Sequence, residues 1–150
     1  MMTDEANKGQ FIQVSSIRVR YSETDKMGIV YNSNYFVWFE IARTEYCRHF
    51  GKSYRGWEAK GYFLPVVESY CNFKYPAGYD DTVALHCRAP VDQIKPHSIL
   101  FEYRLCLDTG SVIADGWTKH AFVNSEGKIY RKGNEFYDWL LREAGRLNSC

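Results

Sequence analysis

The chain has 150 residues, a length that suits one domain with its own core and is too short for two ordinary domains. Aromatic residues make up 17% of it, and its formal net charge is only +1. This balance gives no electrostatic reason to expect a nucleic-acid or membrane-surface partner, although small clusters of Lys and Arg can still bind a phosphate.

The chain begins with the polar stretch MMTDEANKGQ, and we expect residues 1–12 to form a loose terminus. From Ser16 the run SIRVRY alternates, with Ile17, Val19 and Tyr21 on one face and two arginines on the other. Alternation of this kind predicts a half-buried first strand.

A Gly-containing loop around Asp25 follows the first strand. After it, aromatic and apolar residues recur at helical steps of three and four from Tyr35 to Phe50, which predicts a helix of about four turns. Its first half is apolar on nearly every side and should be buried. Charges between Glu40 and Arg48 indicate that its second half emerges toward solvent or another subunit.

Four further strands are predicted beyond the polar segment 51–61. The runs FLPVVESYCNFKYPA, DTVALHCRAP, SILFEYRLCL and VIADGWTKHAFVN alternate, and DTGS makes a turn between the last two. These strands are consecutive, and we expect them to be antiparallel. The run NEFYDWLLREAGRLN closes the chain as a short amphipathic helix.

Together these elements predict an α+β fold: a curved antiparallel sheet of about five strands around one long central helix, with a short C-terminal helix. The sheet needs a layer over one face and the helix needs burial on most sides, so one arrangement satisfies both. No repeat or linker divides the chain, so we treat residues 1–150 as a single domain. Because one sheet encloses only part of the helix, the exposed remainder and the sheet edge predict a homodimer or homotetramer.

Five cysteines lie at wide spacings, with no Cys-x-x-Cys pair, which is typical of free thiols in a reducing compartment. The chain start lacks the apolar core of a signal peptide, and no apolar run has the length of a membrane span. We therefore expect a cytoplasmic protein. No His, Asp or Glu pair shows metal-ligand spacing, so we expect neither a metal nor another cofactor.

The stretch VRYSETDKMGIVYNSNYFVWFEIARTEY resembles the hotdog-fold acyl-CoA thioesterases of the 4-hydroxybenzoyl-CoA thioesterase family, especially its bacterial acyl-CoA thioesterase branch. The likeness rests on an Asp, a Gly, two apolar residues, a Tyr, an Asn-Tyr pair and a Phe-Glu-x-Ala-Arg continuation: Asp25, Gly28, Ile29, Val30, Tyr31, Asn34, Tyr35, Phe39, Glu40, Ala42 and Arg43. The segments FLPVVESYCNFKYPAGYDD and GWTKHAFVNSEGK extend it over roughly residues 14–130. Many members of the branch have His directly after the Tyr, where this chain has Asn32.

The resemblance implies hydrolysis of an acyl-CoA thioester to a carboxylic acid and coenzyme A. It makes Asp25 the catalytic carboxylate, acting as a nucleophile or as a general base for water. Taken alone, the loop ETDKMG favours a turn in which Asp accepts backbone hydrogen bonds.

The start of the predicted helix offers donors for the thioester carbonyl oxygen. Backbone amides there have no partner within the helix, and the amide of Asn32 or a neighbour is the candidate for stabilising the oxyanion. Asn32 and Asn34 also suit helix capping, and both roles are compatible. Tyr31, Asn34 and Tyr35 are candidate substrate-binding residues. The aromatic side chains of Tyr31, Tyr35 and Trp38 suit an aromatic acyl group but fit a helix core equally well.

Other acidic residues and the histidines are less specific. Glu23 suits solvation or pairing with a cation such as Arg20, and Glu68, on a predicted strand, is an alternative acid or base that could also contact substrate. The histidines, none of them in the loop, are His49, His86, His97 and His120. Their placement counts against hotdog hydratases and dehydratases, which typically use a His with an acidic residue, and favours satisfied strand positions for His86 and His120.

Coenzyme A carries several phosphates, which makes Lys95, Arg131 and Lys132 candidate contacts, although isolated basic residues in loops are usually only solvated. The acyl group can be short-chain, hydroxybenzoyl-like or carried on acyl carrier protein. Two rival interpretations are a hotdog hydratase or dehydratase acting on acyl-CoA, and a non-catalytic module that binds acyl thioesters.

Overall fold

The computed structural model describes residues 9–148, so residues 1–8 of the predicted loose terminus and Cys150 lie outside the described part. The elements, in chain order, are β1 (Ile12–Arg18), η1 (Tyr21–Glu23), α2 (Ser33–His49), α3 (Tyr54–Ala59), β2 (Val66–Phe73), β3 (Thr82–Arg88), η2 (Val91–Gln93), β4 (Ile94–Lys95), β5 (Ser98–Leu107), β6 (Val112–Ala121) and α4 (Glu135–Asn148).

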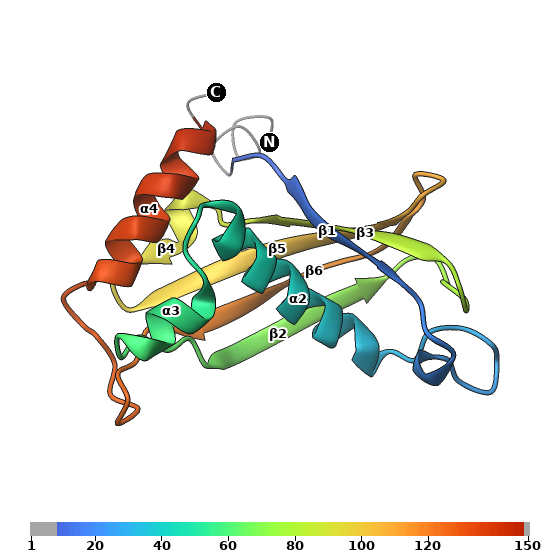
Figure 1. The fold of residues 1–150 in the computed structure, drawn as a ribbon, viewed down its shortest axis with the longest axis horizontal. Helices are drawn as coiled ribbons and strands as arrows, with labels where there is room; N and C mark the ends of the chain where they lie inside the picture. Colours follow the sequence, from blue (N-terminus) through green and yellow to red (C-terminus); the bar gives the residue numbers. More distant parts are fainter. Residues whose placement is uncertain (1–8, 149–150) are drawn as a thin grey trace.

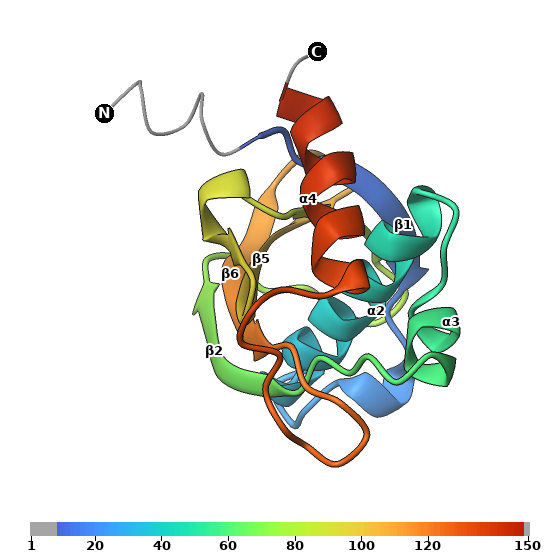
Figure 2. The same ribbon diagram turned by 90° about the vertical axis from the view of Figure 1, so that its left-hand side faces the viewer.

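The strands form one antiparallel sheet in the order β1-β3-β5-β6-β2, with the two-residue β4 beside β5. The sheet curves around α2, which lies in its concave side (Figure 2), while α3 and α4 lie toward one end of the molecule (Figure 1). The predicted α+β architecture is confirmed. The sheet has six strands instead of about five, because a two-residue strand is too short to show alternation.

The strand order differs from the order in the sequence. β2 pairs with β6 at one edge of the sheet, and β3, which follows β2 in the chain, pairs with β1 and β5. Segment 74–81 therefore crosses from β2, at one edge of the sheet, to β3, which lies next to the opposite edge strand β1. Alternation indicates which face of a strand is buried but not which strand lies beside it, so sequence spacing could not reveal this crossover.

The first strand also begins earlier than its alternation predicted. It spans Ile12–Arg18, and Tyr21, predicted to face the core, belongs to η1 and is exposed. Val19 keeps the alternation for one residue more: it is buried, and it exchanges backbone hydrogen bonds with Asp80 and Asp81. Beyond it the chain turns, and the pattern no longer reports a strand.

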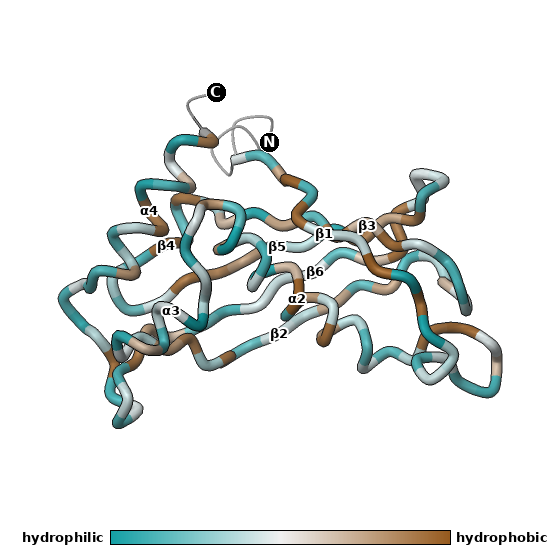
Figure 3. Tube along the Cα trace, viewed as in Figure 1, coloured by the Kyte–Doolittle hydropathy of each residue, from teal (hydrophilic) through white to brown (hydrophobic). Residues whose placement is uncertain are grey.

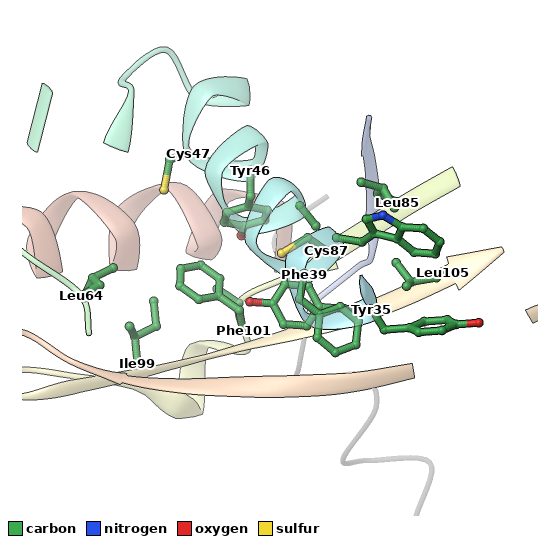
Figure 4. Packing of buried hydrophobic residues seen from close by; sticks show 14 of the residues in the cluster. Tyr35, Phe39, Tyr46, Cys47, Leu64, Leu85, Cys87, Ile99, Phe101 and Leu105 are labelled. Carbon is green, nitrogen blue, oxygen red and sulfur yellow. The ribbon is translucent and has the colours of Figure 1, made fainter. Parts of the chain in front are cut away.

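Side chains of α2 fill the concave side of the sheet (Figure 4). Those that are buried include Tyr35, Trp38, Phe39, Ala42 and Tyr46. The ring of Phe39 stacks on that of Tyr103, with centroids 4.3 Å apart and planes within 9°. It lies over Gly116, where an added Cβ would come within 3.0 Å of the Phe39 ring.

The opposite side of α2 is uncovered in this chain. Phe36 is 36% exposed and Val37 is 48% exposed, so the prediction that the first half of the helix is buried on nearly every side is wrong for the single chain. The sheet covers one side of the helix and leaves an apolar strip on the other.

Polar residues interrupt the apolar ones along α2 and α4 (Figure 3). No helix within residues 9–148 is long and apolar enough to cross a membrane. The four cysteines in this range, Cys47, Cys71, Cys87 and Cys106, are free thiols as predicted.

A chain of buried hydrogen bonds runs between β5, β6 and the segment before β2. The Tyr103 hydroxyl lies against Thr118 Oγ1, which is 2.8 Å from His120 Nε2, while His120 Nδ1 is 2.9 Å from the carbonyl oxygen of Leu64. A carbonyl can only accept, so His120 Nδ1 donates and neutral Nε2 accepts. Burial, with a smaller contribution from the charge of Arg43, lowers the pKa of His120 to about 4, although the Leu64 carbonyl opposes the shift.

Acid should therefore destabilise the fold through His120. Because its pKa is lower in the folded than in the unfolded state, the unfolded chain binds more protons between about pH 4 and 6.5. As the pH is lowered through this window, the free energy of unfolding should fall in the wild type. In His120→Gln, which cannot titrate at this position, it should fall by on the order of 2 kcal/mol less. Urea titrations at several pH values measure this difference; equal pH slopes in both proteins would contradict the assignment.

Candidate active site

The loop that carries Asp25 is closed by its own hydrogen bonds. The Asp25 amide donates to the Ile29 carbonyl at 2.9 Å, and the Gly28 amide donates to the Asp25 carbonyl at 3.0 Å. Gly28 has φ of +79°, a left-handed conformation that glycine adopts without strain. A bridge between Thr24 and Val30 closes the base of the loop. The backbone around Asp25 is thus held in one shape.

The Asp25 carboxylate is divided between two roles. Oδ1 accepts from the Met27 amide at 2.8 Å, as a turn residue would. Oδ2 accepts no hydrogen bond from any group in residues 9–148, and the side chain is half-buried. The turn interpretation and the catalytic interpretation are therefore compatible, because each uses a different oxygen.

The crossover between β2 and β3 fastens the far side of this loop. The Val30 amide donates to the Ala77 carbonyl at 2.8 Å, and Ile29 forms a bridge with Gly78. Since Ala77 and Gly78 belong to the segment that crosses the sheet, the strand order itself holds the loop in place.

The start of α2 presents free backbone donors. Neither the amide of Asn32 nor that of Ser33 has an acceptor in the described part of the chain, whereas the next two amides bond to the Tyr31 and Asn32 carbonyls. The side chain of Asn32 caps nothing, and that of Asn34 donates to the Glu23 carbonyl at 2.9 Å, so neither residue caps α2 with its side chain. With no acidic residue in the first turn, the positive end of the helix dipole is open to an anion.

A pocket of ≈430 Å³ brings these groups together. Its lining includes Asp25, Tyr31, Asn32 and Tyr35, four of the six residues predicted for catalysis and acyl binding. The Tyr35 ring packs edge-on against Phe73 at 5.0 Å, and burial, followed by the neighbouring Cys71, raises the pKa of its hydroxyl. Tyr35 therefore stays a neutral donor near pH 7.

Other predicted site residues lie elsewhere. Glu68 pairs in register with Lys119, and its near neighbour Tyr70 stacks on Trp117, so Glu68 points to the face of the sheet away from α2. Asn34 supports the loop and does not line the pocket.

The basic candidates are also distant. Lys95 lies in β4, and Arg131 and Lys132 lie just before α4, at the end of the molecule opposite the Asp25 loop (Figure 1). The structure does not bring them together with the pocket of this chain.

The pocket also has a wall that the sequence patterns did not indicate. It is formed by four consecutive residues at and after the end of β2: Phe73, Lys74, Tyr75 and Pro76. Lys74 Nζ lies 2.7 Å from Asp115 Oδ2, which places a cation beside the pocket. Alternation marked these residues as strand, and only the crossover after β2 brings them against α2.

A family model described as the thioesterase-like superfamily matches residues 19–143. Among curated proteins, the chain is similar to YneP of Bacillus subtilis, named as a candidate acyl-CoA thioesterase, with 32% identity over 129 residues, 85% of this chain and 92% of that one. It is also similar to the acyl-CoA thioesterase YbgC of Haemophilus influenzae, with 33% identity over 94 residues, 62% of this chain and 68% of that one.

Solved structures give the same result. A DHNA-CoA thioesterase from Staphylococcus aureus superposes with a TM-score of 0.81 at 29% identity, covering 90% of this chain and 91% of that one.

Proposed function

Because this chain belongs to the thioesterase-like superfamily and has its hotdog fold, we propose that it hydrolyses acyl-coenzyme A thioesters to a carboxylic acid and coenzyme A. One observation carries the proposal. One pocket is lined by Asp25, whose carboxylate Oδ2 accepts no hydrogen bond within residues 9–148, and by Asn32, whose backbone amide has no acceptor in that range.

In this mechanism the thioester carbonyl oxygen lies at the start of α2. As a nucleophile attacks the carbonyl carbon, negative charge develops on that oxygen, and the amides of Asn32 and Ser33 stabilise it. Because these donors are fixed by the helix, they need no reorganisation during the reaction. The thiolate of coenzyme A then leaves as the carbonyl re-forms.

Asp25 supplies the attack in one of two ways. As a general base, Oδ2 takes a proton from water, the hydroxide adds to the carbonyl carbon, and the departing thiolate receives the proton. As a nucleophile, Oδ2 adds directly, the thiolate leaves, and water hydrolyses the resulting anhydride. Both routes give the same acid and thiol.

The pocket walls favour a short or aromatic acyl group. Tyr31, Tyr35, Phe73 and Tyr75 present aromatic surface to the bound acyl chain. The substrate thioester is carried on coenzyme A or on acyl carrier protein. A panel of both, assayed for the released coenzyme A or carrier thiol, separates hydrolysis from binding without release.

The free cysteine thiols in the described chain support a reducing compartment, and we place the protein in the cytoplasm.

Replacing Asp25 by Asn should lower kcat by about a hundred- to ten-thousandfold with little change in KM, because the variant keeps the Oδ1 acceptor for Met27 and loses only the charge. Steady-state kinetics on the best substrate of the panel measure this. Glu68→Gln is the rival variant: if it, and not Asp25→Asn, abolishes turnover, the assignment is wrong. A single turnover in oxygen-18 water, with enzyme in excess, distinguishes the two routes, since a nucleophilic carboxylate acquires label itself.

Asn32→His introduces the residue that many members of the bacterial acyl-CoA thioesterase branch carry at this position. We expect kcat to change by less than about threefold, because the proposed contact at this position is the backbone amide, which the substitution retains. The same assay measures it. A sharp rise in turnover would mean that this chain lacks a catalytic side chain.

We also propose that two copies join along β2. This strand lies at the sheet edge with its outer backbone groups unpaired, and it exposes Val67 (55%), Tyr70 and Phe73. It runs beside α2 (Figure 1), on which Phe36 and Val37 are also exposed. Phe73 belongs both to this strand and to the pocket wall, so a second copy joined here would lie close to the pocket.

Sedimentation at micromolar concentration should therefore give a dimer or tetramer for the wild type. Val67→Lys should shift the protein to monomer, because a charge on the pairing strand opposes edge association. Gln13→Lys, on the opposite edge strand β1, is the matched control and should leave the mass unchanged. A monomeric wild type would contradict this assembly.

A further inference from the structure

Glu23 is a buried carboxylate two residues before Asp25, and it was expected to be solvated or paired with Arg20. Its exposed fraction is 5%, so solvation is excluded, while the Arg20 pair is present with Nε 3.4 Å from Oε1. Both carboxylate oxygens are also hydrogen-bonded: Oε1 accepts from the Arg20 amide at 2.8 Å, and Oε2 accepts from Trp38 Nε1 at 3.0 Å.

The backbone of Glu23 joins the same two parts of the molecule. Its carbonyl accepts from the Tyr31 amide at 2.9 Å and from Asn34 Nδ2 at 2.9 Å. Tyr31 ends the loop, and Asn34 and Trp38 lie in the first two turns of α2. The hydrogen bonds of Glu23 therefore connect the segment just before Asp25 to the start of α2, which carries the amide of Asn32.

Trp38 gives this tie a rigid anchor. Its ring is buried in the core, with an exposed fraction of 1%, so its indole N–H has a fixed position relative to α2. If Trp38 were lost as a donor, Glu23 Oε2 would be buried without this hydrogen bond, which is costly away from water. The loop can leave its present position only by breaking that contact.

We propose that Glu23 is a positioning residue: through its hydrogen bond to Trp38, it fixes the position of Asp25 relative to the backbone amides of Asn32 and Ser33. The inference rests on the proposed function, because it assigns Glu23 a part in that reaction. Catalysis of this kind requires the attacking oxygen and the oxyanion donors to keep a fixed separation, and a displacement of about 1 Å can lower the rate about a hundredfold. Glu23 touches neither substrate nor reacting atoms; it acts through the loop.

The two test variants are Glu23→Gln and Trp38→Phe. A glutamine has one oxygen for two N–H donors, so its NH₂ group must face either Arg20 or Trp38. Trp38→Phe removes the donor and keeps an aromatic ring in the core. In the double variant the contact between positions 23 and 38 is already absent, so the second substitution should lower kcat by less than it does alone.

The chain offers a matched control in Trp57→Phe. Trp57 is equally buried, but its Nε1 has no hydrogen-bond partner within residues 9–148, and it lies in α3, at the end of the molecule away from Asp25 (Figure 1). A loss of kcat that arose simply from removing a buried indole would appear in this variant too.

Kinetics with the best acyl-CoA substrate should show kcat about ten- to a hundredfold lower in Glu23→Gln and Trp38→Phe, with KM within about threefold of wild type and Trp57→Phe near wild type. A purely structural role would lower the melting temperature and leave kcat of the folded protein unchanged. That result, or equal losses in Trp57→Phe, overturns the proposal while the hydrolase function stands.

Hydrogen exchange tests the anchoring without any substrate. Amides of the 24–31 peptide should exchange about tenfold or more faster in Glu23→Gln than in wild type, while peptides from β5 and β6 keep their protection. If Glu23→Gln shows the faster loop exchange but the wild-type protein hydrolyses no member of the panel, the proposed function fails and the anchoring role of Glu23 is supported. Unchanged loop exchange in both variants would defeat the anchoring role itself.

Discussion

Burial of one face of α2 by the curved sheet is the constraint on which the rest of the structure depends. Phe39 stacks on Tyr103 above Gly116, where a side chain would collide with the Phe39 ring and with the Tyr70 carbonyl, so the close approach of the helix to the sheet at this point requires glycine. Trp38 and Tyr46 extend the contact along the helix. Close packing of this kind fixes the axis of α2, and with it the position of the helix start.

The chemistry follows from where that helix start lies. Asn32, whose backbone amide has no acceptor within residues 9–148, lines the pocket because α2 begins at Ser33, directly beside a loop that is held on three sides. The loop is closed by its own turn, joined to the crossover at Ala77, and tied to the helix through Glu23. The Asp25 carboxylate and the start of α2 are therefore held in place by the core and the crossover, and not by the short loop alone.

The same curvature has a cost in exposed surface. A single sheet that covers one face of α2 leaves Phe36 and Val37 exposed, and it ends in an edge strand, β2, on which Val67 is also exposed. The last residue of that strand, Phe73, lines the pocket, so the exposed edge and the pocket share a residue. The walls contributed by Phe73 and Tyr75 belong to that edge as well.

The sequence by itself determined the type of most elements: the long central helix, the short C-terminal helix, the alternating strands and the loop that carries Asp25 before a helix start near Asn32. Those features are local, because a period of two or of 3.6 residues records which side of an element is buried. It did not determine that β2 pairs with β6, that Lys74 and Tyr75 reach the pocket, or that Glu23 is buried against Trp38. These depend on contacts between distant segments, which periodicity does not encode. Only the tertiary structure decided them, since the crossover and the packing of α2 bring those segments together.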